Sequence, residues 1–224
     1  MKFHHAIGII GGAGPQASAF LYSSILEVCQ KDYGSNDFNA FPEILIVSYP
    51  FTRGNPERIT TEIALCLQKL ESAGAHFYAM ACNTFHAFLP DVSKYRFVHL
   101  IQEALQEAAR LKLSKSLILA APKTVELKLY EESLMLCVYP SPEDQLLVNG
   151  IIREVASGEI GERQSRALSE IISRTRKNHP IDGVVLGCTE LPLVHAKRPV
   201  CDLPIVDSVK VLAKRLVALA AGVA

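Results

Sequence analysis

The chain has 224 residues, of which 49% are hydrophobic and 21% charged, and its 23 basic side chains balance 23 acidic ones. This composition can supply a core and excludes a disordered or collagen-like chain, while the lack of a basic excess argues against nucleic acid as a partner. No apolar run reaches the ~18 residues of a membrane span and the first residues lack a signal-peptide pattern, so we expect a cytoplasmic protein without membrane partners.

Short apolar runs alternate with segments of helical periodicity. Runs that are apolar throughout are typical of strands buried on both faces of a parallel sheet. The predicted strands are Ala6–Ile10, Ile44–Ser48, His76–Cys82, Phe97–Leu100, Ser116–Ala121, Leu136–Tyr139, Val184–Cys188 and Leu203–Val206. The predicted helices are Pro15–Lys31, Pro56–Ala73, Ile101–Leu111, Thr124–Glu132, Pro142–Ser157, Glu162–Asn178 and Asp207–Ala221. This alternation predicts an α/β fold with right-handed crossovers.

The pattern repeats coarsely in two halves, and each half contains one strand that ends in a cysteine. We therefore predict two similar lobes, each a mostly parallel four-stranded sheet flanked by helices, facing each other across a cleft. The last helix has no strand after it and is compatible with either lobe.

A glycine-rich turn follows the first predicted strand and reads Gly11-Gly12-Ala13-Gly14-Pro15. Its match to the dinucleotide fingerprint is nominal, because the second strand ends in Ser48-Tyr49-Pro50 without the acid that binds a ribose. Glycines permit close backbone approach, and a helix N-terminus attracts anions. The turn is thus interpreted as a ligand contact through residues 12–14, or as a tight turn without a ligand.

Two cysteines occupy matching places at the ends of predicted strands, in Cys82-Asn83-Thr84 and in Cys188-Thr189-Glu190. Ligand crevices form at this edge of open α/β sheets, and helix N-termini or polar donors favour a thiolate. Two such groups on opposite sides of a carbon can exchange the roles of base and acid, which implies inversion at a carbon acid.

The other cysteines are interpreted as small buried hydrophobes: Cys29, Cys66, Cys137 and Cys201. The sequence has no C-x-x-C pair, so no metal site is predicted.

The chain resembles the cofactor-independent aspartate/glutamate racemase family in its glycine turn, in Cys82-Asn83-Thr84 and in Leu186-Gly187-Cys188-Thr189-Glu190. The order and separation of these motifs match the family over nearly the whole chain. The resemblance implies an active site between the lobes, with Cys82 and Cys188 as the two acid/base residues. It also implies no PLP, metal or nucleotide cofactor, and a homodimer. The C-terminal segment, residues 207–224, is expected to complete the first lobe, 1–98, beside a second lobe of 99–206.

An amino-acid substrate, aspartate or glutamate, is expected to be held by Gly12, Ala13, Gly14, Arg53, Asn83, Thr84, Thr124, Thr189 and Glu190. The family often has an arginine near Arg53 that grips a side-chain carboxylate, although a solvated loop residue is the alternative. Glu190 is suited to orient the second thiol or to bind the substrate ammonium group. The family's first threonine of Gly-Thr-x-x-Thr is replaced by Ala121, for which Lys123 is the candidate substitute.

Three other functions stay open. Hydantoin racemases, maleate isomerases and arylmalonate decarboxylases also use one or two strand-end cysteines. Cys82 and His86 are four residues apart, as a Cys–His hydrolase would allow, but triads usually converge from separate segments, and His86 is expected at the surface or as a cap. The third alternative is a non-catalytic amino-acid-binding protein.

Overall fold

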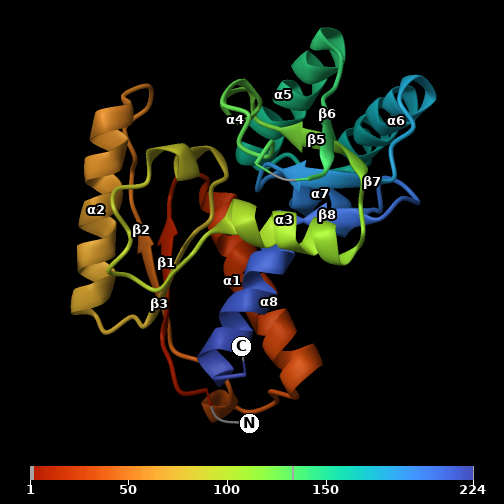
Figure 1. Cartoon of the computed structure of the whole chain (residues 1–224). Helices are drawn as coiled ribbons and strands as arrows, with labels where there is room; N and C mark the ends of the chain where they lie inside the picture. Colours follow the sequence, from red (N-terminus) through yellow and green to blue (C-terminus); the bar gives the residue numbers. More distant parts are fainter. Residues whose placement is uncertain (1–2, 133, 224) are drawn as a thin grey trace. The chain divides into compact units, whose positions relative to one another are not determined.

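A computed structural model describes residues 3–132 and 134–223 of the chain (Figure 1). The chain forms two compact units. Unit 1 comprises the described residues up to Leu100 together with those from Val209 onward, and unit 2 comprises Ile101–Ser208. Residues 1, 2 and 224, which the predicted lobes include, lie outside the described residues, as does residue 133.

Unit 1 contains a parallel sheet in the order β2-β1-β3-β4. Its strands are β1 (Ile7–Gly11), β2 (Ile44–Ser48), β3 (Phe77–Met80) and β4 (Phe97–Val98). Its helices are α1 (Pro15–Tyr33), α2 (Pro56–Ser72) and α8 (Ser208–Ala221), with the short 3₁₀ segments η1 (Phe38–Ala40) and η2 (Thr84–Phe88). In Figure 1, α2 lies on one side of this sheet, and α1 and α8 lie on the other.

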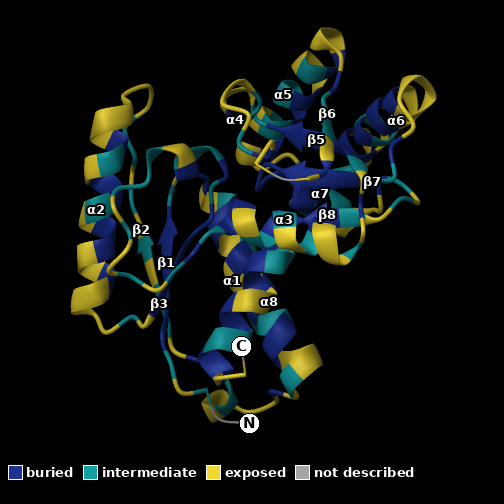
Figure 2. Ribbon diagram, in the orientation of Figure 1, coloured by how far each residue is buried: buried dark blue, intermediate teal, exposed yellow. Residues whose placement is uncertain are grey.

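The central strands of unit 1 are apolar because both of their faces are covered. Ile7, Ile9 and Ile10 of β1 are at most 1% exposed, and α2 packs Ile63 and Leu67 into the same core as Ile10. Figure 2 shows the result as dark-blue strands beside a helix α2 whose outer side is yellow.

Three helices begin at a proline that follows a capping or glycine residue. Pro15 opens α1, Pro56 opens α2 behind Asn55, whose side chain accepts a hydrogen bond from the Arg58 amide, and Pro142 opens α5 behind Ser141. A missing N–H costs nothing in the first turn, where no backbone acceptor is present. These starts agree with the predicted ones.

Unit 2 contains a second parallel sheet, in the order β6-β5-β7-β8. Its strands are β5 (Lys115–Ala120), β6 (Leu136–Val138), β7 (Gly183–Gly187) and β8 (Ile205–Asp207). Its helices are α3 (Leu100–Arg110), α4 (Pro122–Glu126), α5 (Pro142–Ala156), α6 (Glu162–Asn178) and α7 (Leu191–Lys197). Helices α5, α6 and α7 share one core with β5 and β7.

The two sheets have the same strand order, with β1 equivalent to β5 and β3 equivalent to β7. The predicted two-lobe α/β fold with a four-stranded parallel sheet in each lobe is confirmed. One predicted helix is too long, and one helix is missing from the prediction. The helix expected at Thr124–Glu132 ends at Glu126, because Lys128 adopts a left-handed φ of 54°, and α7 was not predicted.

Within the described part of the chain, none of the helices has the length and apolarity that crossing a membrane requires.

Candidate functional site

The glycine turn after β1 is shaped by its neighbours in unit 1. Gly12 has φ +99°, and a Cβ there would lie 2.2 Å from the Tyr49 carbonyl oxygen. The Tyr49 amide donates to the Gly11 carbonyl at 3.0 Å, which draws the end of β2 against the turn. The Ser18 hydroxyl accepts from the Gly12 amide at 3.1 Å and donates to the Gly14 carbonyl at 3.0 Å. The fold alone therefore demands glycine at position 12, and Ser18 is a supporting residue that no sequence motif indicated.

The first cysteine turn lies at the same edge of the sheet as the glycine turn. Ile10 pairs with Met80 in register, so residues 12–14 and 82–84 follow neighbouring strand ends. Cys82 is half-buried two residues beyond β3, Asn83 is buried, and Thr84 begins η2. The structure thus brings the glycine turn and the first cysteine turn to the carboxyl ends of β1 and β3.

Of the two expectations for His86, the surface position is wrong because the residue is buried, whereas its bond to Leu100, the first residue of α3, agrees with a capping residue. Its Nδ1 lies 2.7 Å from the Cys82 carbonyl oxygen, and its Nε2 accepts from the Leu100 amide at 3.2 Å. Both ring nitrogens are engaged with the backbone, so neither is available as a base for the Cys82 thiol. This removes the base that a Cys–His hydrolase would need.

Arg53 lies in the loop that follows β2, with an exposed side chain. The loop is anchored next to it by Thr52, whose amide and hydroxyl donate to the Glu62 carboxylate at 2.9 and 2.7 Å. The Thr52 hydroxyl and amide bonds hold the pKa of Glu62 below its usual value. Nothing in the sequence pattern pointed to Glu62, which comes from α2 and meets the loop only in the folded unit.

The second cysteine turn belongs to unit 2 and is more deeply buried. Cys188 directly follows β7 and is 6% exposed, and its thiol donates to Glu190 Oε2 at 3.0 Å. The Thr189 hydroxyl donates to the same carboxylate oxygen at 3.2 Å. Glu190 was expected either to orient the Cys188 thiol or to bind the substrate ammonium group. These contacts support the first of the two roles.

The glycine before Cys188 accommodates a side chain of the protein. A Cβ at Gly187 would lie 2.8 Å from Cε2 of Tyr130 and 3.3 Å from Cβ of Ala120. Tyr130 is 1% exposed, and burial raises its pKa, so its hydroxyl stays protonated. The Tyr130 ring therefore occupies the space that a side chain at position 187 would need.

The turn after β5 contains the position of the missing threonine. Ala120 pairs with Gly187, so this turn and Cys188 lie at one edge of the sheet. Thr124 is buried in α4. Lys123 donates to Glu126 at 2.6 Å, and 45% of its side chain is exposed. This arrangement does not support the expectation that Lys123 takes the place of the missing threonine.

The remaining cysteines differ from this pair in their surroundings. None of the six described cysteines forms a disulfide, and Cys29 and Cys66 are fully buried in unit 1. Burial raises the pKa of each of these two thiols to about 11, so they remain protonated. Across residues 3–132 and 134–223, no three His, Cys, Asp or Glu side chains gather as a metal site requires.

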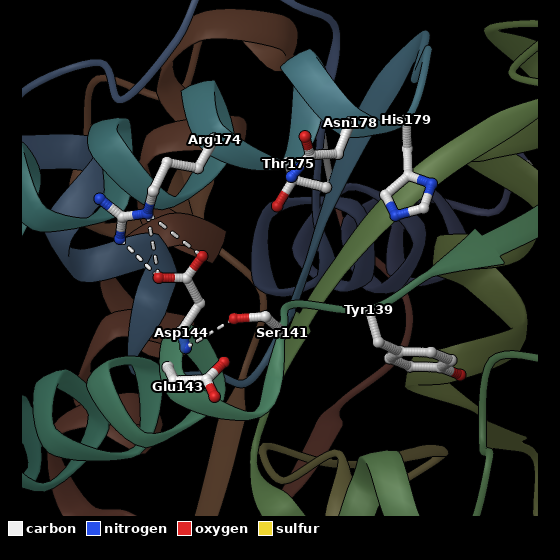
Figure 3. A pocket seen from close by; sticks show the side chains of 8 residues that line it. All are labelled: Tyr139, Ser141, Glu143, Asp144, Arg174, Thr175, Asn178 and His179. Atoms are coloured by element: carbon white, nitrogen blue, oxygen red, sulfur yellow. Dashed lines mark hydrogen bonds and ion pairs between the residues drawn. The ribbon is translucent and has the colours of Figure 1, made fainter.

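A cavity of about 350 Å³ in unit 2 lies between the start of α5 and the end of α6 (Figure 3). Two of its charged groups are paired with each other, since Arg174 donates to the Asp144 carboxylate through Nε at 3.1 Å and through its terminal nitrogen at 2.5 Å. None of the residues singled out in the sequence lines it. The cavity is therefore separate from the cysteine turn of its unit.

The sequence model of the Asp/Glu/hydantoin racemase family matches residues 10–216. The chain belongs to this family. The match includes both cysteine turns and the whole glycine turn. Membership in the family supports an isomerase that racemises amino acids.

Individual relatives agree with the family. The broad specificity amino-acid racemase RacX of Bacillus subtilis (strain 168) is 26% identical, over 94% of this chain and 96% of that protein. The crystal structure of an aspartate racemase homologue from Pyrococcus horikoshii OT3 has a TM-score of 0.79 and 30% identity, covering 97% of this chain and 99% of that one. The aspartate racemase of Picrophilus torridus, with a TM-score of 0.81, 21% identity and coverage of 97% and 94%, shares the fold.

Proposed function

We propose that the chain interconverts the L and D forms of aspartate or glutamate without PLP, with Cys82 and Cys188 as two acid/base groups. The observation that carries the proposal is the equivalence of their positions. Cys82 follows β3 and Cys188 follows β7, and each of these strands is third in its sheet order. Each cysteine is followed within two residues by a threonine and then by a helical turn. Family membership supports the same class of reaction.

In the proposed reaction, the thiolate of one cysteine removes the α-proton, so that an S–H bond forms as the C–H bond breaks. The thiol of the other cysteine then donates its proton to the opposite face of the carbon. The roles reverse for the opposite enantiomer. Thiol and thiolate suit this exchange because both forms are accessible near neutral pH.

Glu190 fits this scheme as the partner of Cys188. The 3.0 Å bond between the thiol and the carboxylate gives the proton a place to go when Cys188 must act as a base. The Thr189 hydroxyl holds the same carboxylate oxygen and so limits its rotation. With the proton on sulfur, Cys188 is ready to act as the acid.

The substrate carboxylates are assigned to donors at the strand ends: the amides of the turn at residues 12–14, apart from that of Gly12, which donates to Ser18, and the side chains of Asn83, Thr84, Thr124 and Thr189. The substrate amine is assigned to the oxygen acceptors of the same side chains. Such donors stabilise the negative charge that develops as the α-proton leaves. Arg53 is proposed to bind the side-chain carboxylate of an acidic substrate, where a guanidinium supplies both charge and geometry.

A racemase for other amino acids is the second candidate. Ala121 cannot donate a hydrogen bond where the family has a threonine, and Lys123 is engaged by Glu126. A relative of nearly the same length is described as a broad specificity amino-acid racemase. The substrate panel should therefore include neutral and basic amino acids beside the acidic ones.

The test is circular-dichroism polarimetry in heavy water with L-aspartate, L-glutamate, L-alanine and L-lysine, without added cofactor. The proposal expects loss of the optical signal together with deuterium at the α-carbon. Exchange without loss of the signal indicates a single working thiol. Release of carbon dioxide indicates a decarboxylase, and saturable binding without exchange indicates an amino-acid-binding protein.

The two cysteines are tested separately. We expect Cys82→Ala and Cys188→Ala each to abolish net racemisation, because one group cannot serve both faces of the carbon. Cys201→Ala is the matched control, since Cys201 is also a free cysteine of unit 2 and lies partly buried at a distance of 3.9 Å from the Leu203 carbonyl. Near-native turnover in either of the first two variants refutes the two-base mechanism.

A further inference from the structure

His86 occupies an unusual position between the cysteine turn and the end of unit 1. It lies in η2, is 7% exposed, and comes four residues after Cys82. Its ring packs edge-on against His99, with 4.4 Å between ring centroids, and against Phe97 at 6.0 Å. The imidazole is therefore enclosed by its own unit.

The two hydrogen bonds of His86 determine its tautomer. The Leu100 amide can only donate, so Nε2 must accept from it, and the Cys82 carbonyl can only accept, so Nδ1 must carry the proton. This neutral tautomer satisfies both partners. A second proton on Nε2 would face the Leu100 N–H and break that bond.

Burial, with His99 beside the ring, lowers the pKa of His86 to about 3. The ring therefore stays neutral at any pH at which the protein would be assayed. His99 and the adjoining Cys82 turn are the titratable neighbours that face it. A role for His86 as a proton carrier is inconsistent with these surroundings.

The bond to the Cys82 carbonyl restricts the backbone that holds the thiol. On the N-terminal side, the Ala81 amide donates to the Ile10 carbonyl at 3.3 Å, which ties the turn to the sheet. On the C-terminal side, the imidazole fixes the peptide plane between Cys82 and Asn83. Because the main chain is held on both sides of Cys82, rotation about χ1 of its side chain is the main motion left to the thiol.

The bond to Leu100 ties this arrangement to α3. Leu100 is the first residue of that helix, where backbone N–H groups have no acceptor within the helix, and it is also the last residue of unit 1 before the chain enters unit 2. One side chain thus joins the cysteine turn to the beginning of α3, 14 residues further along the chain.

We propose that His86 is a positioning residue, a neutral imidazole that fixes the main chain of Cys82 so that its thiol reaches the substrate carbon in one orientation. This inference rests on the proposed function, in which Cys82 is one of the two acid/base groups. It assigns His86 no contact with the substrate and no proton of the reaction.

The test compares three substitutions. The amide of His86→Asn reaches about as far as Nδ1 and keeps the bond to the Cys82 carbonyl, whereas the amide of His86→Gln reaches about as far as Nε2 and keeps only the bond to Leu100. His86→Ala removes both. His76→Ala is the matched control, because His76 lies just before the other end of β3 and also bonds the backbone, accepting from the Ala6 amide at 3.1 Å.

Four quantities are measured: kcat of racemisation, KM of racemisation, the pH profile of kcat/KM, and the rate at which iodoacetamide labels Cys82 relative to Cys201, read by mass spectrometry. Misplacement of a reacting group by about 1 Å costs about 10²-fold in rate. We therefore expect His86→Ala and His86→Gln to lower kcat by about 10²-fold with KM changed less than ~3-fold. His86→Asn should stay within ~10-fold of the wild type, with the apparent pKa values of all profiles unchanged.

The inference is overturned if His86→Ala keeps kcat within ~3-fold of the wild type, or if His86→Asn loses the acidic limb of the pH profile, which would make His86 a proton carrier. If His86→Ala does not fold, the comparison of the Asn and Gln variants decides, and equal kcat values overturn the inference. If the wild-type protein exchanges no α-proton, the proposed function fails. In that case the ratio of Cys82 to Cys201 labelling still tests the positioning of Cys82. Positioning by His86 requires that this ratio changes in the Gln variant and stays unchanged in the Asn variant.

Discussion

Substitution of Gly12 by alanine tests how the folded unit, rather than a ligand, constrains the glycine turn. Gly12 has φ +99°, and its added Cβ would meet the Tyr49 carbonyl oxygen at 2.2 Å and the Tyr49 nitrogen at 2.6 Å. A left-handed backbone costs an alanine about 1–2 kcal/mol, and overpacking adds about 1–3 kcal/mol. Because the clashing atoms belong to the backbone, no side-chain rotation relieves them. The expected loss in the free energy of unfolding is thus ~2–5 kcal/mol.

The control separates the two contributions. Gly74 lies in the same unit with φ +92°, and a Cβ there would meet nothing within 4 Å, so Gly74→Ala should cost only the ~1–2 kcal/mol of the backbone conformation. Urea unfolding followed by far-ultraviolet circular dichroism gives the free energy of unfolding of both variants. The two values are compared directly when the dependence on urea concentration has the same slope. If Gly12→Ala loses no more stability than Gly74→Ala, the close approach of Tyr49 does not constrain the turn.

Three further substitutions test individual contacts. Arg53→Ala should raise KM for aspartate or glutamate by ~10-fold with kcat little changed, and an unchanged KM removes Arg53 from the site. Glu190→Gln should lower kcat by ~10²-fold or more, because an amide cannot take the proton of Cys188, and a kcat near that of the wild type refutes this role. Glu62→Gln should destabilise the protein at pH 7. The bonds to Thr52 lower the pKa of Glu62 in the folded protein, so the stabilisation that they give is lost as pH falls through that pKa. The free energies of unfolding of the variant and the wild type should therefore converge in acid. A difference between them that is constant with pH contradicts this account.

Local patterns predicted most of the secondary structure. Continuous apolar runs identified the strands because a strand covered on both faces has no polar side to alternate with. The predicted starts of α2 and α5 at Pro56 and Pro142 are confirmed, and in the structure each of these prolines follows a capping residue. The helix predicted from Thr124 failed at Lys128, whose left-handed backbone ends the helix early, and no propensity signal at a lysine announces such a conformation.

The candidate site was predictable to the extent that it depends on position along the strands. Cys82 and Cys188 were recognised because parallel strands carry the residues that follow them to one edge of a sheet. The roles of Glu62 and His86 were not, because each depends on a partner far along the chain: Thr52 for Glu62, and Leu100 for His86.

The amino-acid sequence by itself determined the class of fold, the two matching strand-end cysteines and the family to which the chain belongs, since these depend on apolar periodicity and on short motifs. Only the tertiary structure decided what surrounds those motifs. It put the Tyr130 ring over Gly187, the Glu190 carboxylate against the Cys188 thiol and the His86 imidazole under Cys82. Hydrogen bonds and close packing depend on distances of a few ångströms between side chains and backbone, which chain order does not specify.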